Sequence, residues 1–282
     1  MVEHRRFGNL LPHLILIVGV IIVAFPVYLA IIASTQDNVA IANGQMTLYP
    51  GGHALETYWH TIVSGTGKTT REPVGGMMQS SFIMAVGIAV GKIAISIISA
   101  YAIVFFSFPF RMAAFWTIFI TLMLPVEVRI FPTYKITSDL HMLDSYSGLI
   151  LPLIASATAT LLFRQFFMTI PKELVEASKM DGAGPIRFFF DTLLPLSVTN
   201  IAALFVILFI YGWNQYLWPL LITTRDDMQT IVIGIKKIID VHDALTEWSV
   251  AMATAVLAML PPVAIVVLLQ RLFVKGLIET EK

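Results

Sequence analysis

The sequence has no cysteine among its 282 residues, so it can form no disulfide and offers no cysteine nucleophile or metal ligand. Charged residues are scarce, at 13%, where soluble domains carry about 25%. Because the formal net charge is zero, no basic balance indicates nucleic acid as a partner. The motifs H-E-x-x-H and G-x-S-x-G are absent, no carboxylates cluster at metal-site spacing, and the six histidines are scattered. We expect a chain that is not itself an enzyme and holds no metal or cofactor.

Hydrophobic residues make up 57% of the chain, and the mean hydropathy is +0.81. This composition predicts an all-α integral membrane protein. Six continuous apolar runs approach or exceed the ~20 residues that cross a bilayer as a helix, and none alternates as a barrel strand does. The predicted spans are residues 10–34, 78–106, 113–131, 147–167, 201–223 and 248–273.

Six spans place both termini on the same side of the membrane. The short segments predicted to face the cytoplasm carry more lysine and arginine than the outer ones, so we expect cytoplasmic termini. Residues 1–34 form an N-terminal segment with the first span, residues 35–77 an outer loop of irregular structure with short helical pieces, and residues 78–282 a core of five spans.

Residues 62–70, IVSGTGKTT, come within one residue of the phosphate-binding pattern G-x-x-x-x-G-K-[ST]. Ile62 stands where the first glycine belongs, and Pro73 follows closely, so no long helix can begin there to hold phosphate. The segment also falls in the outer loop, away from cellular ATP. If the chain works with ATP, a partner must hydrolyse it.

A polar interruption at residues 170–196 separates two apolar runs, and we call this segment the elbow. Pro171 and Glu173 suit the first turn of a short helix. Gly182 is placed to end that helix in the left-handed conformation, and Pro185 to begin a second one. Charges such as Arg187 keep the segment soluble. The pattern predicts a helical elbow on the cytoplasmic face, gripped by a soluble partner; the alternative is an amphipathic helix lying on lipid headgroups.

Charged side chains within a span are candidates for the translocation path, because they tend to face protein or water. Glu127 and Arg129 lie in the third predicted span, with Pro125 and Pro132 on either side. On a regular helix the two side chains point about 200° apart. Either a path role or an ion pair with a neighbouring helix is consistent with this pattern. Lys92, in the second span, is interpreted as a packing residue or a subunit contact.

The segment YGWNQYLWPLL places Asn214, Gln215 and Tyr216 at membrane depth. The two amides should face a partner, water or substrate, or bond to another helix. Gly87 and Gly91 offer a small-residue face for close helix contact. Aromatic residues near the predicted outer ends are interpreted mostly as interfacial anchors: Tyr211, Trp213, Tyr216, Trp218 and Trp248.

The elbow sequence resembles the EAA loop in permease subunits of bacterial ATP-binding-cassette importers. The resemblance extends along the chain through LMLPVEVRIFPT, LDSYSGLILPL, LLFRQFFMTIPKEL and WNQYLWPLLI, which are similar to the carbohydrate-uptake group. It implies the type I importer permease fold. Ser178 replaces an alanine of the motif and Thr192 an isoleucine. By resemblance, the docking residues are Glu176, Ala177, Ser178, Asp181, Gly182 and Ala183, with Glu173 and Arg187 beside them.

The same resemblance implies a complex in the inner membrane: a second, related permease, two ATPase subunits that use ATP and magnesium, and a periplasmic binding protein. VEVRIFPT, SATAT and RQFFMT resemble permeases for sn-glycerol 3-phosphate, with glycerophosphodiesters as related substrates. A neutral sugar or polyol is the alternative substrate. An ion-coupled secondary transporter, a different class, would favour internal repeats, and none is visible.

Overall fold

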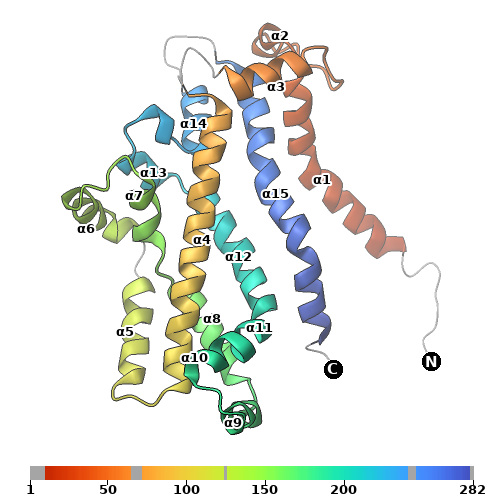
Figure 1. Cartoon of the computed structure of the whole chain (residues 1–282). Coiled ribbons are helices and arrows are strands. Elements are labelled where there is room, and N and C mark those ends of the chain that lie inside the picture. The colour runs from red at the N-terminus through yellow and green to blue at the C-terminus, as the bar shows by residue number, and fades with distance from the viewer. Residues whose placement is uncertain (1–9, 65–71, 124–125, 241–245, 280–282) are drawn as a thin grey trace. The chain divides into compact units, whose positions relative to one another are not determined.

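The computed structural model describes residues 10–64, 72–123, 126–240 and 246–279, and in these residues every regular element is a helix (Figure 1). The chain divides into two compact units, residues 1–76 with 234–260 and residues 77–233 with 261–282. Most of the segment resembling a phosphate-binding loop, from residue 65 on, lies outside the described residues.

The first unit is built around α1 (Leu10–Ser34), with α2 (Asn38–Ala42) and α3 (Ala54–Val63) following it. One side chain organises the irregular segment between α2 and α3. The Gln36 amide donates to the Thr47 and Tyr49 carbonyl oxygens, at 2.7 and 2.8 Å, and its oxygen accepts from the Thr47 N–H at 3.1 Å. The prediction of short helical pieces in an irregular loop is confirmed.

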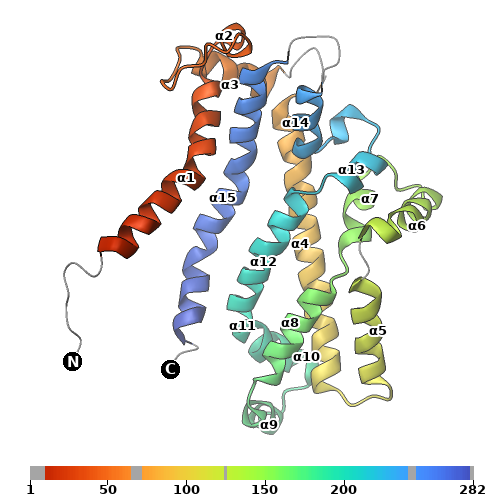
Figure 2. The same ribbon diagram turned by 180° about the vertical axis from the view of Figure 1, so that it is seen from behind.

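Three of the described helices include residues of both units: α4 (Val74–Phe105), α14 (Ile231–Ile239) and α15 (Trp248–Glu279). The second unit begins within α4, which runs most of the length of this unit in Figure 2. The other elements of the second unit are α5 (Arg111–Met123), α6 (Val126–Asp139), α7 (Tyr146–Ile150), η1 (Leu151–Leu153), α8 (Ala157–Met168), α9 (Lys172–Met180), α10 (Pro185–Phe188), η2 (Phe189–Leu193), α11 (Leu194–Leu196), α12 (Val198–Trp213), α13 (Leu217–Ile222) and η3 (Asp226–Met228).

Three helices are long and apolar enough to cross a membrane, at Pro12–Ser34, Val74–Phe105 and Trp248–Leu272. Two bent pairs pass the same test, α7 to α8 with a bend of 51° and the segment Pro185–Leu196 to α12 with a bend of 71°. The described residues thus hold up to five spans by length and composition. The remaining prediction, residues 113–131, corresponds to two helices, because α5 ends at Met123 and α6 begins at Val126.

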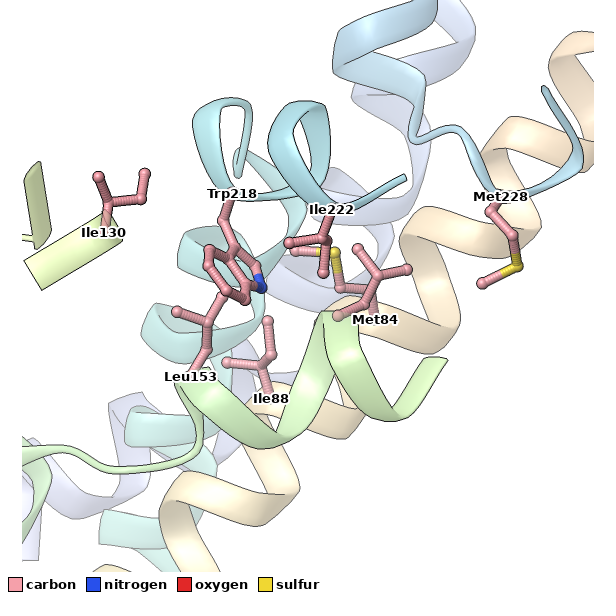
Figure 3. Packing of buried hydrophobic residues seen from close by; sticks show 8 residues of the cluster. Met84, Ile88, Ile130, Leu153, Trp218, Ile222 and Met228 are labelled. Atoms are coloured by element: carbon pink, nitrogen blue, oxygen red, sulfur yellow. The ribbon is translucent and has the colours of Figure 1, made fainter. Parts of the chain in front are cut away.

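A hydrophobic cluster joins α4 to the elements at the end of the second unit opposite α9. Trp218 of α13 is 1% exposed at its centre, beside Ile88 and Leu153 (Figure 3), and its indole N–H donates to the Gly148 carbonyl at 3.2 Å. The cluster consists of Met84, Ile88, Ile130, Leu149, Leu153, Trp218, Ile222 and Met228. The anchor interpretation is wrong for Trp218, and for Trp213, which is buried against the Phe209 ring.

Glycines let helices meet closely, as the small-residue face predicted. A Cβ on Gly87 would lie 2.6 Å from the Ile150 side chain, and one on Gly91 would lie 2.5 Å from that of Ile154. Such close approach maximises van der Waals contact, which replaces the hydrophobic effect as the driving force between helices in lipid.

Asp144 joins the α6–α7 connection to the segment after α13. Its carboxylate accepts hydrogen bonds from the Thr224 N–H, from the Thr224 hydroxyl at 2.6 Å and from the Arg225 N–H at 3.0 Å. Its own N–H donates to the Ile222 carbonyl at 3.0 Å. Burial raises the pKa of Asp144, but these hydrogen bonds and the nearby Arg225 charge outweigh burial, so the pKa lies below its ordinary value of 3.8.

We expect Asp144→Ala to lower the free energy of unfolding by about 1–3 kcal/mol, because hydrogen bonds to a charged group are lost. The pKa of Asp144 is lower in the folded chain than in the unfolded one. Its carboxylate therefore stabilises the fold fully above the unfolded pKa of about 3.9, and this stabilisation is lost as the pH falls through the folded pKa. The gap between wild type and variant should therefore close below about pH 4. Thermal midpoints at several pH values measure this, with Asp139→Asn, in an exposed pair with Lys135, as control. A gap that is constant with pH contradicts the interpretation.

Candidate functional site

The elbow begins with α9 and turns at Gly182, as the sequence predicts. Gly182 has φ +74°, and its N–H donates to the Lys179 carbonyl at 3.0 Å. The N–H of Ala183 donates to the Ser178 carbonyl at 3.0 Å. These two bonds form the Schellman motif, which satisfies carbonyls at the helix end. No neighbouring atom lies within 4 Å of where a Cβ would sit, so the left-handed conformation, and not crowding, requires glycine here.

The residues predicted for docking lie on one short, solvent-accessible segment. Two exposed apolar side chains accompany them, Met180 at 83% and Ile186 at 76% exposure. Arg187 pairs with Asp191 at 3.1 Å on the exposed side of the elbow. The exposed members of the predicted set are Glu173, Glu176, Ala177, Asp181, Gly182 and Arg187, and the half-buried ones are Ser178 and Ala183.

The opposite side of the elbow is attached to the end of α4. The Tyr101 hydroxyl donates to the Pro185 carbonyl at 2.8 Å. The Tyr101 ring lies 5.1 Å from that of Phe189, and the Phe105 ring 5.4 Å from that of Phe188, between centroids. We call Tyr101, Phe105, Phe188 and Phe189 the aromatic clasp. No local sequence pattern predicts it, because its two halves, Tyr101 with Phe105 and Phe188 with Phe189, lie more than 80 positions apart.

A cavity of about 320 Å³ lies between the aromatic clasp and α9. Besides clasp residues it is lined by Phe106, Val175, Ser178, Lys179, Ala183 and Pro185. The elbow is therefore held at α10 and η2, while α9 is packed less tightly against α4.

The elbow continues directly into a membrane span. After α10 the chain forms the π-helical turn η2, then α11, and bends by 71° into α12. Ser197 at the bend donates its hydroxyl to the Leu193 carbonyl at 2.7 Å, which satisfies a polar group within the segment. A displacement of the elbow would thus reach two spans, α4 through the aromatic clasp and α12 through the chain itself.

The residues predicted for the translocation path lie in two groups. Arg129 is half-buried in the first turn of α6, and the Glu127 side chain lies outside the described residues. Asn214, Gln215 and Tyr216 form the break between α12 and α13. Asn214 is exposed and Tyr216 half-buried, while Gln215 donates its amide to the Tyr211 carbonyl at 3.2 Å. The side-chain hydrogen bond of Gln215 thus stays within this part of the chain, four residues from Gln215 itself.

Lys92, interpreted from the sequence as a packing residue, is buried near the middle of α4. Its Nζ lies 3.8 Å from the centre of the Tyr211 ring of α12. A cation over an aromatic face is a favourable contact, and it joins α4 to α12.

The helical architecture and the solvent-exposed elbow between spans define a membrane transport subunit. Residues 82–279 match the family of binding-protein-dependent transport system inner membrane components. The chain belongs to this family.

Relatives align over the full length of both chains. The sn-glycerol-3-phosphate transport system permease protein UgpE of Rhizobium meliloti is 59% identical, and the protein of the same name from Pectobacterium atrosepticum is 56% identical, each over 282 residues. A solved bacterial ABC transporter involved in import of the acidic polysaccharide alginate has a chain of the same fold, with a TM-score of 0.80, 17% identity, and coverage of 96% of this chain and 98% of that one.

The Schellman turn predicts the effect of substitution at Gly182. Gly182→Val should raise the hydrogen-exchange rate of the α9 amides roughly 5- to 30-fold, because a side chain in the left-handed conformation costs about 1–2 kcal/mol. Gly182→Asn should change it less, since asparagine tolerates this conformation. Gly184→Ala, at φ −71° and in open space, is the matched control. Equal exchange rates in the valine variant and wild type would contradict the turn.

The aromatic clasp predicts that Tyr101→Phe loosens α10. Loss of one hydrogen bond, worth about 1 kcal/mol, should raise amide exchange in residues 186–190 about five-fold. Tyr101→Leu should raise it further, since the ring contacts are lost as well. Exchange in α9 and α10 is measured by mass spectrometry on the assembled complex. Unchanged exchange in both variants would show that the clasp does not hold the elbow.

Proposed function

We propose that this chain is a permease subunit of an ATP-driven, binding-protein-dependent importer that carries sn-glycerol 3-phosphate across the inner membrane. The observation that carries the proposal is the elbow, whose exposed Met180 and Ile186 lie among charged residues on a segment fixed to two spans. An exposed apolar patch with a polar rim is typical of a protein interaction site. The substrate is taken from the full-length relatives, which are named for its transport.

In this proposal an ATPase subunit binds the elbow through Glu173, Glu176, Ala177, Ser178, Asp181, Gly182, Ala183 and Arg187. The remaining partners are a second, related permease, another ATPase copy and a periplasmic binding protein. ATP and magnesium belong to the ATPase subunits, and this chain contributes no ATP site. The elbow and both termini then face the cytoplasm, which agrees with the lysine and arginine bias of the short inner segments.

Mechanically, the proposal requires that ATPase closure displace the elbow. The aromatic clasp passes this displacement to α4, and the 71° bend passes it to α12. Helices packed through glycine contacts, such as that of Gly212 against Ala85, move together because close packing resists local deformation. The permease pair would thus alternate between states open to either side.

The test is ATP hydrolysis and solute uptake by the whole complex reconstituted in liposomes, with sn-glycerol 3-phosphate, a neutral polyol or maltose. We expect the binding protein loaded with sn-glycerol 3-phosphate to stimulate both activities, and the other solutes to have no effect. Stimulation by a neutral solute instead would keep the importer and reject the phosphate substrate. Uptake without the ATPase subunits, driven by an ion gradient, would support the secondary-transporter alternative and reject the proposal.

A further inference from the structure

Arg164 is a cation in an apolar helix, near the end of a span. It lies in α8, one turn before that helix ends at Met168 and the chain enters the elbow. In the part of the chain that the structure describes, Arg164 forms no salt bridge, and its Nε atom is buried without a hydrogen-bond partner. Charged residues in spans pair with one another or mark functional sites. An arginine with no carboxylate partner there points to a ligand or a partner outside the chain.

The guanidinium group is held against a ring of the neighbouring helix. Its central carbon lies 4.7 Å from the centre of the Phe115 ring of α5. Phe115 is buried, and its ring lies 6.0 Å from that of Phe119 in a stacked arrangement. A cation–π contact with a fixed ring orients the guanidinium and leaves its charge in place. The terminal nitrogens of Arg164 are neither buried nor hydrogen-bonded among the described residues, so their donors are open to an anion.

A second arginine lies on the same face of α5. Arg111 precedes Phe115 by four residues, which places it one turn nearer the start of the helix on the side that Arg164 contacts. Arg111 is exposed and forms no salt bridge among the described side chains. The helices α4, α5 and α8 contain no aspartate or glutamate, so no carboxylate on them opposes the two charges. The charge of this region is complementary to an anion.

Exposed aromatic rings flank Arg111 along the chain. Phe110 is 84% exposed with φ +64°, and Trp116 is 50% exposed. Because a bulky residue rarely adopts the left-handed conformation, Phe110 occupies a strained turn that keeps its ring outside the core. The start of α5 and the end of α8 lie at the same end of the second unit as α9 (Figure 1, Figure 2). Exposed rings beside arginines at the end of a span are typical of the depth of lipid headgroups, which favours a lipid over a soluble anion.

We propose that Arg164, with Arg111 beside it, binds the phosphate group of an anionic phospholipid in the leaflet on the side of the elbow. The planar fork of arginine matches phosphate oxygens, and basic sites between spans suit lipid headgroups. The exposed rings of Phe110 and Trp116 then contact the apolar part of the lipid. This inference is independent of the solute that the complex carries. It assigns a lipid ligand to the segment that leads into the elbow.

The test uses the whole complex in phosphatidylcholine vesicles that contain a small fraction of photoactivatable phosphatidylglycerol. After illumination, mass spectrometry locates the cross-linked lipid on peptides. In wild type, residues 106–116 and 157–168 should be labelled more strongly than by photoactivatable phosphatidylcholine, whose headgroup has no net charge. Arg164→Gln should lower this labelling about ten-fold, because hydrogen bonds to a charged group are lost. Arg164→Lys should keep part of it, since the charge remains and the fork is lost.

Arg271→Gln is the matched control, because Arg271 is an exposed arginine on a different helix, α15; its labelling should equal that of wild type. Arg111→Gln should lower the labelling less than Arg164→Gln, since an exposed arginine is solvated without the lipid. Phosphatidylglycerol should raise the thermal midpoint of wild type and leave that of Arg164→Gln unchanged, because a ligand stabilises only the state that binds it. Arg164→Lys keeps the proposal testable if the glutamine variant does not assemble.

Equal labelling of wild type and Arg164→Gln overturns the proposal. Loss of wild-type labelling on addition of inorganic phosphate also overturns it, because the site would then belong to a soluble anion. Release of a partner subunit by Arg164→Gln, with labelling unchanged, would assign the arginine to a protein contact and likewise reject the lipid.

Discussion

The structure depends on one constraint: hydrocarbon satisfies no hydrogen bond, so polar groups within the spans must be satisfied by the chain itself. Threonine hydroxyl groups are satisfied within their own helix: those of Thr160 and Thr254 donate to the carbonyls four residues earlier, at 2.8 Å each. The indole N–H of Trp218 is satisfied by another element, because it donates to the Gly148 carbonyl of α7. Where backbones approach closely, glycine makes the approach possible: a Cβ on Gly148 would collide with the Met142 carbonyl.

The same constraint explains why the elbow differs from the rest of the second unit. It lies between spans, where charged side chains can be solvated and need no internal partner, so α9 can be exposed and still stable. Its attachment is made at its apolar side, by Phe188 and Phe189 against α4. Rigid attachment on one side and an open surface on the other suit a segment that receives a mechanical input.

The parts of the fold predicted from the sequence are those determined by local chemistry. Gly182 and Pro185 encode the turn and the second helix of the elbow, because a left-handed C-cap and a first-turn proline depend only on neighbouring residues. Trp213 and Trp218 were interpreted wrongly for the opposite reason. An aromatic residue near a span end suits either the interface or a core, and only packing against distant residues such as Leu149 decides between them. The contact of Tyr101 with Pro185 is likewise tertiary.

Lys92 shows why packing and function are difficult to separate within a membrane span. A methionine would fill the same space beside Tyr211 without the cost of a buried charge, so packing alone does not account for lysine. Lys92 also shares α4 with Tyr101, about two and a half turns or about 14 Å along the helix. The contact of Lys92 with Tyr211 joins α4 to α12, the same two helices that the elbow connects through Tyr101 and through the 71° bend.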